Sequence, residues 1–299
     1  MIFEIDSVLQ SKKQSILDTI KAHNLTPTLL IVSANDDFAS SKYINNKVKF
    51  AKEMGVEAAV LKTTYNTTTE ALIKDIKTVF ETYNVKNKKV DGVIVQLPIN
   101  PNINLHLLNQ TIDQYNCYGD VDGFGVSSVA GLYYNDVDYN NGFVNVPCTA
   151  QGVFDIVNDF YNQNVSGKSI VIINRSNIVG KPLALLCLHN NMTVTIAHSK
   201  TTKQDLYDAI SKADVVVTAV GIKQFINNKD FKFKKGGLIV DVSINRNQDG
   251  KVCGDVDKVL YDSEEVYCTK VPGGVGKLTV ANLISNIVNS AVKTKETLK

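Results

Sequence analysis

The sequence is poor in several residue types that mark particular classes of protein. It has no tryptophan, four histidines, only two arginines and five cysteines among its 299 residues. The cysteines are odd in number, and neither a CxxC pair nor a suitably spaced histidine completes a zinc site. We therefore expect free thiols in the reducing environment of the cytoplasm, and no metal centre.

An excess of charge of either sign is also absent. Lys and Arg together number 32 against 30 for Asp and Glu, which leaves a net charge of +2. Proteins that bind nucleic acid or anionic membranes need concentrated positive charge, so we expect neither partner. No stretch approaches the ~18 continuous apolar residues of a membrane span, and the first residues, MIFEIDSVLQSKK, lack the apolar core of a signal peptide.

The rest of the composition is that of an ordinary globular protein. Hydrophobic residues make up 44% of the chain and charged residues 21%, and a chain of this length forms one large or two medium domains. Short β-branched runs alternate with stretches of helical spacing, which predicts an α/β fold with a parallel sheet covered by helices on both faces. The expected strands are 28–33, 91–97, 169–173, 193–197, 214–220 and 237–242, and the expected helices are about 11–23, 40–55, 68–83, 150–161, 181–190, 203–211 and 278–296.

A change in composition near the middle of the chain suggests a domain boundary. Residues 131–146 are rich in Asn, Asp, Gly and Tyr and have neither period, which predicts a loop between two α/β units. The apolar positions of the last helix need a partner surface, and the helix can find it by returning to the first unit. We therefore expect a first domain of residues 1–146 completed by 271–299, and a second domain of residues 147–270.

The segment SIVIINRSNIVGKPLALLCL (169–188) is a strand, a tight turn and a helix, as in dinucleotide-binding folds. Asn174 and Ser176 occupy the first two glycine places of a GxGxxG pattern, and only Gly180 keeps the third. Asparagine tolerates left-handed backbone, the Ser176 hydroxyl can donate to a phosphate, and Gly180 permits a close approach of helix and strand. The signal is weak by itself, because every α/β fold contains such units.

Two nearby features indicate which dinucleotide would bind. Arg175, one of the two arginines, lies in the turn, and a guanidinium group binds phosphate in a bidentate manner. After the next expected strand, Ser199 and Lys200 stand where an NAD site carries an acid for the ribose hydroxyls. A cation without an acid favours a 2′-phosphate and hence NADP, with NAD as the weaker choice; alternatively, 198–201 is only a solvated loop.

A second group of motifs carries side chains suited to proton transfer. Tyr43 and Lys47 lie four residues apart on the expected helix 40–55 and so share a face, although both can equally be surface groups. Gln96 ends an expected strand at the carboxyl edge, where α/β proteins bind ligands. GDVDGFG (119–125) places two carboxylates in a turn, and PGGVGKLT (272–279) is a glycine-rich turn against which a ligand can lie.

Together and in this order, the motifs resemble the bifunctional methylenetetrahydrofolate dehydrogenase/methenyltetrahydrofolate cyclohydrolase family. The resemblance covers about residues 30 to 285 and rests on Tyr43-xxx-Lys47, VQLP (95–98), DVDG (120–123), PCT (147–149), RSNIVGKP (175–182), HSKT (198–201), DVSIN (241–245), GDV (254–256) and PGGVG (272–276). It implies an N-terminal folate-binding catalytic domain, a Rossmann-type NADP-binding domain, and a C-terminal helix that returns to the first domain. It also implies a homodimer that acts on tetrahydrofolate derivatives.

The resemblance implies roles for individual residues as well. Lys47 matches the family's catalytic lysine, Tyr43 its partner on the same helix, and Gln96 the glutamine that holds the lysine. Asp122 matches the aspartate that anchors the pterin ring. Further contacts to folate are implied for Leu97, Pro98, Pro272, Gly273 and Gly276, and contacts to the cofactor for Thr149, Asn174, Arg175, Ser176, Ile178, Ser199 and Ile244.

The implied chemistry oxidises 5,10-methylenetetrahydrofolate to the 5,10-methenyl form with NADP and hydrolyses that product to 10-formyltetrahydrofolate. Hydride transfer depends mainly on positioning, whereas the addition of water and ring opening need proton shuttling. A lysine beside the methenyl cation acts as a neutral amine because like charges repel, so we expect Lys47 to serve the hydrolytic step. The alternatives are a dehydrogenase without the second activity, a catalytically silent nucleotide-binding protein on the same scaffold, and a shikimate-type or other Rossmann oxidoreductase.

Some positions depart from the family pattern. Glycine is usual at Asn174 and at Ser243, and both residues border the cofactor turn. Lys277 follows PGGVG, where it can meet the glutamate carboxylates of a folate tail or simply face solvent. Because of these departures, the structure of the cofactor turn bears most directly on two expectations: the affinity for the cofactor and the preference for NADP.

Overall fold

The computed structural model describes residues 1–35, 38–86, 88–135, 145–247 and 249–297. They divide by contact into an N-terminal unit, Lys12–Val146 with Val280–Lys299, and a central unit, Met1–Ser11 with Pro147–Thr279. Residues 1–11 and 271–279 therefore group with the central unit, whereas the sequence led us to expect them in the first domain. The physical reason at the N-terminus is strand pairing: Ile2 forms a parallel bridge with Cys268, and the Phe3 amide donates to the Cys268 carbonyl at 2.9 Å.

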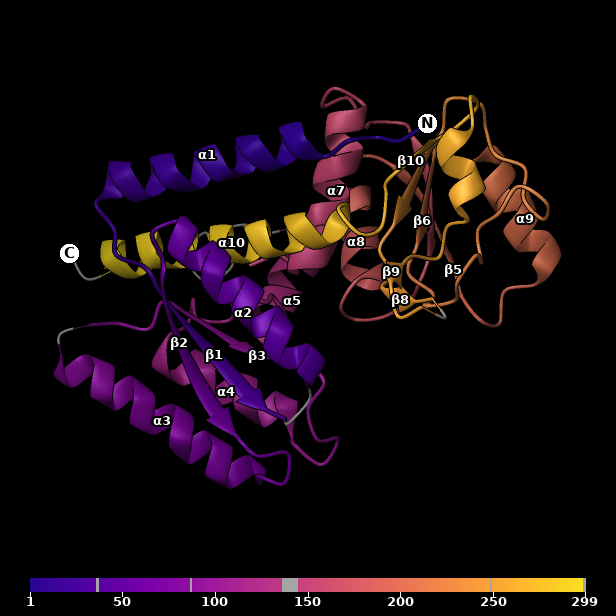
Figure 1. Ribbon diagram of the computed structural model, residues 1–299. Coiled ribbons are helices and arrows are strands. Elements are labelled where there is room, and N and C mark those ends of the chain that lie inside the picture. Colours follow the sequence, from indigo (N-terminus) through magenta and orange to yellow (C-terminus); the bar gives the residue numbers. More distant parts are fainter. Residues whose placement is uncertain (36–37, 87, 136–144, 248, 298–299) are drawn as a thin grey trace. The chain divides into compact units, whose positions relative to one another are not determined.

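The N-terminal unit is built on a three-stranded parallel sheet with the order β2-β1-β3 (Figure 1). Alternate residues of the central strand face opposite sides of the sheet, and Leu30 and Val32 pack in one buried cluster with residues of α3 and α4. The elements of this unit are β1 (Thr28–Ala34), α2 (Phe38–Glu53), β2 (Glu57–Thr63), α3 (Thr69–Val85), β3 (Gly92–Val95), α4 (Leu105–Tyr115) and α5 (Val126–Tyr134).

Two long helices belong partly to each unit. Helix α1 (Asp6–His23) enters the N-terminal unit at Lys12, and α10 (Val275–Thr297) enters it at Val280. Within that unit the Ser290 hydroxyl lies 2.6 Å from the Asp91 carbonyl oxygen and 2.8 Å from that of Tyr118. The expected return of the C-terminal helix to the first α/β unit is therefore confirmed.

The central unit contains a five-stranded parallel sheet with the order β10-β7-β6-β4-β5. Val171, Val216 and Ile239 on one face of the sheet belong to a buried cluster that also includes Ile210 of α9. The elements are α7 (Cys148–Phe160), β4 (Ser169–Ile173), α8 (Gly180–His189), β5 (Thr193–Ala197), α9 (Lys203–Lys212), β6 (Val215–Thr218), β7 (Leu238–Asp241), the antiparallel pair β8 (Asn245–Arg246) and β9 (Val252–Cys253), the 3-10 helix η1 (Lys258–Asp262) and β10 (Tyr267–Cys268). The α/β class with parallel sheets is confirmed.

The structure corrects the sequence reading at several elements. The loop expected from residue 131 begins later, because α5 continues to Tyr134 and ends at Asn135 in left-handed conformation; residues 136–144 of that loop lie outside the described part. Strand β2 and helices α4 and α5 were not expected. Strand β2 is an edge strand of exposed and half-buried residues. Its sequence, EAAVLKT, has a single valine in place of the β-branched run that marks the buried strands.

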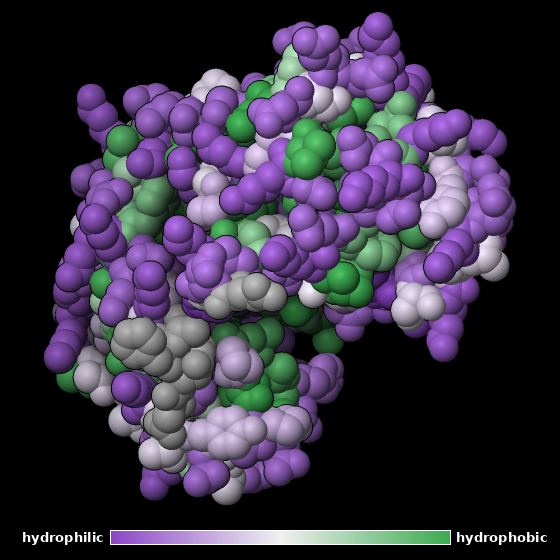
Figure 2. Space-filling view, turned by 45° about the vertical axis from the view of Figure 1, so that its right-hand side comes forward, coloured by the Kyte–Doolittle hydropathy of each residue, from purple (hydrophilic) through white to green (hydrophobic). Residues whose placement is uncertain are grey.

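The surface is mainly hydrophilic, as expected from the composition of a globular protein. Hydrophilic residues cover most of the face in Figure 2, and apolar residues appear among them in smaller areas. In the part of the chain that the structure describes, no helix combines the length and the hydropathy that crossing a bilayer requires. All five cysteines are free thiols, with only Cys117 exposed.

Candidate functional site

The side chains of Lys47 and Gln96 meet in the N-terminal unit. Lys47 lies on α2, and its Nζ donates to Oε1 of Gln96 at 3.0 Å. Gln96 follows β3, is buried with 9% of its surface exposed, and donates from Nε2 to the Leu97 carbonyl at 2.6 Å. Its backbone amide extends the sheet by donating to the Val32 carbonyl at 2.8 Å. The backbone and both ends of the Gln96 side chain are thereby fixed, so the position of the Lys47 amine is defined.

The turn 120–125 separates the functions of its two carboxylates. Asp120 accepts hydrogen bonds from the backbone amides of Gly123 and Phe124 at 3.1 Å and of Gly125 at 2.7 Å, so it stabilises the turn. Asp122, the second acid of the turn, is partly buried and is not used to stabilise the turn in this way. Burial, together with the nearby Asp120, raises the pKa of Asp122 to about 6 against the lowering effect of Lys47. An amine, an amide and a carboxyl group whose pKa is near neutrality therefore lie in one unit.

The other predicted folate contacts divide between the two units. Tyr43 lies one helical turn from Lys47 and is 43% exposed, and Leu97 and Pro98 directly follow Gln96. Asn35 donates to the Pro98 carbonyl at 2.8 Å, which ties this segment to the end of β1. Pro272, Gly273 and Gly276 belong to the central unit, where Lys277 Nζ lies 3.4 Å from the Asp6 carboxylate.

The central sheet has one topological switch point, between β4 and β6, because β5 lies on one side of β4 and the later strands lie on the other. In open α/β sheets, ligands bind outside the carboxyl ends of the strands at such a point. The segment 174–180 follows β4 and the segment 219–222 follows β6. The predicted dinucleotide turn therefore lies where the topology of the sheet favours a binding site.

Asn174 closes this turn with its side chain rather than through left-handed backbone. Its Oδ1 accepts from the amides of Ser176 at 2.8 Å and Gly180 at 3.1 Å, and its Nδ2 donates to the Ala219 carbonyl at 2.7 Å. Asn174 is not among the residues with positive φ, so the expectation based on backbone tolerance was wrong. The asparagine instead acts as an Asx-type turn residue that also joins the two segments beside the switch point.

Gly180 behaves as the sequence suggested. A Cβ atom at this position would lie 2.2 Å from the Asn174 carbonyl oxygen, which no real side chain could tolerate. Helix α8 begins at this residue, so only glycine allows the helix to start so close to the end of β4. The expected close approach of helix and strand is confirmed.

The remaining predicted cofactor residues are accessible to different degrees. Arg175, Ser199 and Ile178 are exposed, and Ile244, after β7, is 54% exposed. Ser176 is half-buried and its hydroxyl accepts from the Val179 amide at 3.1 Å. Thr149 Oγ1 lies 3.3 Å from the Thr279 hydroxyl. Exposed polar and apolar groups are thus available on the loops that follow the strands.

Asp255, the acid of the GDV motif (254–256), is a residue whose role the sequence did not reveal. Asp255 has no exposed surface, and its carboxylate accepts hydrogen bonds from the loop after β6, from Ser243 in the loop after β7 and from Asn245 at the start of β8. Asp241, at the end of β7, is also fully buried, and burial raises its pKa to about 6. The signal in the sequence was the acid between the glycine and the valine of this motif, near a strand end. A buried acid is uncommon and needs several hydrogen-bond donors around it.

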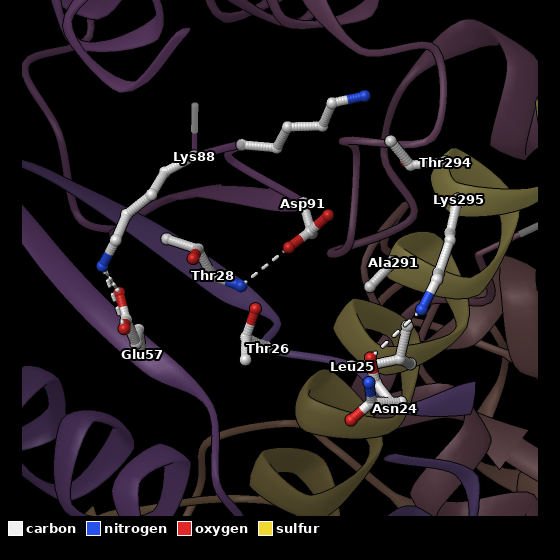
Figure 3. Close-up of a pocket in the computed structure, with 11 residues that line it drawn as sticks. Asn24, Leu25, Thr26, Thr28, Glu57, Lys88, Asp91, Ala291, Thr294 and Lys295 are labelled. Atoms are coloured by element: carbon white, nitrogen blue, oxygen red, sulfur yellow. Dashed lines mark hydrogen bonds and ion pairs between the residues drawn. The ribbon is translucent and has the colours of Figure 1, made fainter. Parts of the chain in front are cut away.

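A cavity of about 300 Å³ lies in the N-terminal unit, at the amino ends of β1 and β2 rather than at the carboxyl end that carries Gln96 (Figure 3). Several of its polar side chains are paired within the protein, whereas the Thr294 hydroxyl is buried with no hydrogen-bond partner among the described residues. Lys88 forms an ion pair with Glu57 at 2.8 Å, Asp91 accepts from the Thr28 amide at 2.8 Å, and Lys295 donates to the Asn24 carbonyl at 3.2 Å. None of the predicted site residues lines this cavity.

The described residues contain no group of three or more His, Cys, Asp or Glu side chains suited to a metal ion. The acids of the turn 120–125 do not form such a group, since Asp120 is bound to backbone amides.

Both parts of the chain match models of one protein family. Residues 4–122 match the catalytic domain of tetrahydrofolate dehydrogenase/cyclohydrolase, and residues 147–295 match its NAD(P)-binding domain.

Individual relatives agree with these matches over most of the chain. The chain is 35% identical to the bifunctional protein FolD of Thermodesulfovibrio yellowstonii, over 98% of this chain and 95% of the relative, and 38% identical to that of Campylobacter hominis, over 92% and 90%. Among solved structures, the bifunctional FolD methylenetetrahydrofolate dehydrogenase/cyclohydrolase of Campylobacter jejuni superposes with a TM-score of 0.84 at 32% identity, covering 98% of this chain and 100% of that one.

Proposed function

Because the chain belongs to the tetrahydrofolate dehydrogenase/cyclohydrolase family, we propose that it oxidises 5,10-methylenetetrahydrofolate to the 5,10-methenyl form and hydrolyses that form to 10-formyltetrahydrofolate. The observation that carries the proposal is the contact between Lys47 and Gln96, 3.0 Å long, in the same unit as the partly buried Asp122. These residues stand on the motifs that the family shares, and their chemistry fits a substrate that gains a positive charge and then takes up water.

In this proposal the N-terminal unit is the folate-binding catalytic domain. The Lys47 amine moves protons during the addition of water and the opening of the ring, and Gln96 holds that amine in place through its Oε1 atom. Asp122 accepts hydrogen bonds from the pterin ring. Tyr43, Leu97 and Pro98 contribute folate contacts from the same unit. Pro272, Gly273 and Gly276 of the glycine-rich turn 272–276 are proposed as further folate contacts.

The central unit is the dinucleotide-binding domain, with NADP rather than NAD as the cofactor. When bound, the cofactor accepts the hydride from the bridging methylene group. The residues proposed to hold it are Thr149, Asn174, Arg175, Ser176, Ile178, Ser199 and Ile244. The close packing at Gly180 and the exposed guanidinium group of Arg175 support this role. The first lets α8 begin directly after the turn, so that its N-terminal amides lie at the turn, and the second can reach a phosphate.

The proposal extends to the setting of the enzyme. We place it in the cytoplasm as a homodimer, as the resemblance to the family implies, with no metal, no nucleic acid and no membrane involved. The near-neutral charge of the chain and its five free thiols are consistent with this setting.

A single assay tests the function. Purified protein is mixed with 5,10-methylenetetrahydrofolate and either NADP or NAD, and the absorbances of the methenyl product and of the reduced cofactor are followed together. Reduced cofactor without accumulation of the methenyl product supports both activities, with a faster reaction for NADP. Accumulation of the methenyl product indicates a dehydrogenase alone, and no change indicates a silent protein; either result would overturn the proposal.

A further inference from the structure

The buried carboxylate of Asp255 joins two loops of the central unit. Among the described residues it accepts six hydrogen bonds, more than any single amide or hydroxyl group could accept. Its Oδ2 accepts from the Thr218 hydroxyl at 2.8 Å, the Val220 amide at 2.7 Å, the Gly221 amide at 3.3 Å and the Ser243 hydroxyl at 2.7 Å, and its Oδ1 accepts from the Ile222 amide at 2.9 Å and Asn245 Nδ2 at 3.0 Å.

The loop after β6 is shaped to meet this carboxylate. Val220, Gly221 and Ile222 direct three successive amides at one anion, an arrangement that needs a residue in left-handed conformation, and Gly221 has a φ of +77°. The anion is supplied from within the protein, so these amides are not free for a phosphate. The loop is therefore held in one shape before any ligand arrives.

Two further side chains, those of Ser243 and Asn174, act on the same loop. Ser243 donates to Asp255 and also accepts from the Gly221 amide at 3.1 Å, and Asn174 donates to the Ala219 carbonyl at 2.7 Å. Each of these side chains adds a link that a glycine cannot make. In this chain, residues 219–222 are consequently fixed from β4, from β7 and from Asp255.

The segments bonded to the Asp255 carboxylate carry two exposed apolar side chains. Ile222 and Ile244 are each 54% exposed, and both lie on segments bonded to Asp255, Ile222 through its own amide and Ile244 through its neighbours Ser243 and Asn245. Both segments follow strands at the carboxyl edge of the sheet. We propose that Asp255 is a positioning residue for the cofactor, which holds Ile222 and Ile244 as apolar contacts for the bound dinucleotide.

This inference rests on the proposed function and names residues of its cofactor site. The test compares Asp255→Asn with Asp257→Asn, a matched loss of charge two residues away at a carboxyl group that only caps η1. An asparagine keeps one acceptor oxygen but turns an NH₂ group toward the donors, so the network of Asp255 is broken at nearly constant volume. The measurements are the dissociation constant for NADP by calorimetry, the KM for NADP, and the hydrolysis of methenyltetrahydrofolate, which needs no dinucleotide.

We expect Asp255→Asn to raise the dissociation constant and the KM for NADP about tenfold or more, and to leave methenyl hydrolysis within about twofold of the wild-type rate. Hydrogen exchange of the amides 220–222 in the protein without cofactor should become faster. Asp257→Asn should change none of these quantities. Wild-type affinity and slow exchange in Asp255→Asn would overturn the inference.

If Asp255→Asn does not fold, Ser243→Gly carries the test. It removes one donor to Asp255 and the acceptor for Gly221, and we expect an increase of about two- to fivefold in the dissociation constant with faster exchange at Gly221. Unchanged affinity and exchange in this variant would contradict the inference equally. A wild-type protein that neither binds NADP nor acts on folate would instead refute the proposed function, and this inference with it.

Discussion

The amine of Lys47 lies 3.0 Å from Oε1 of Gln96, although 48 residues separate them in the chain. The contact joins a helix that precedes the edge strand β2 to the carboxyl end of β3. Since Gln96 is buried and bonded at both ends, the lysine is held by the more rigid partner. This relationship gives the amine a defined place, which a proton-transferring group needs.

The first prediction concerns the role of the amine. Lys47→Met keeps a side chain of similar length without the nitrogen, so methenyl hydrolysis should fall by at least about a hundredfold because proton transfer is lost. Folate should still bind within a few-fold of the wild-type affinity. Lys49→Met, at an exposed lysine two residues along the same helix, is the matched control. Normal hydrolysis in Lys47→Met would remove the lysine from the mechanism.

The second prediction concerns the partnership of Lys47 and Gln96. Gln96→Leu should lower methenyl hydrolysis about tenfold or more, because the amine loses the acceptor that orients it. Combined with Lys47→Met it should have little further effect, since the residue it orients is already absent. Hydrolysis rates of the two single variants and the double variant measure this coupling. Strictly additive effects would show that the two residues act separately.

The third prediction concerns the pH dependence of folate binding. Burial raises the pKa of Asp122 to about 6, and only the ionised carboxylate can accept two hydrogen bonds from a pterin ring. The affinity for folate should therefore fall as the pH decreases through about 6. Asp122→Asn should weaken binding about tenfold or more and remove this acid limb. Burial also raises the pKa of Asp113 to about 6, so Asp113→Asn, which should keep the limb, is the control.

The fourth prediction concerns the choice of cofactor. Arg175→Ala should reduce the preference for NADP over NAD about tenfold or more in kcat/KM, because the guanidinium group favours the additional phosphate. The other arginine of the chain provides the control. Arg246 donates to the Gly250 carbonyl at 3.0 Å in the β8–β9 segment, and Arg246→Ala should leave the preference unchanged. An equal preference for NADP over NAD in the wild type and both variants would show that Arg175 does not recognise the additional phosphate.

The fifth prediction concerns stability and pH. Asp91 is 6% exposed and accepts from the Thr28 amide, and burial raises its pKa to about 6. Between about pH 4 and pH 6 the folded protein then binds more protons at this group than the unfolded chain, so the free energy of unfolding falls as the pH rises. The contribution of this carboxyl group is at most about 3 kcal/mol, the value of a two-unit rise in pKa.

The check on this prediction is urea unfolding at pH 4.5 and 7.5. Asp91→Asn keeps an acceptor for the Thr28 amide but cannot ionise, so its free energy of unfolding should fall less between the two values than that of the wild type. Glu81→Gln, at an exposed acid on α3, should reproduce the wild-type slope. A slope in Asp91→Asn as steep as in the wild type would assign the pH dependence to other groups.

The positions of the predicted site residues show where sequence patterns were sufficient. Gln96 was expected at the carboxyl end of a strand because a polar residue followed a β-branched run, and it does follow β3. Gly180 was expected at a close approach, and its missing Cβ proves necessary. Asn174 was placed correctly in the turn, but for the wrong reason. Asparagine can close a turn through left-handed backbone or through side-chain hydrogen bonds to nearby amides, and the sequence does not distinguish the two; here it uses its side chain.

By itself, the sequence determined the α/β class, the parallel strands, the family and the motifs of the candidate site, because alternation, spacing and residue chemistry are written locally along the chain. Only the tertiary structure decided that Asp255 joins two loops, that Asp120 holds its turn while Asp122 stays available, and that Ile2 pairs with Cys268. These properties depend on the hydrogen-bond donors around a group and on how far the group is removed from water. Segments that are distant in the sequence determine both, because the order of the strands brings them together.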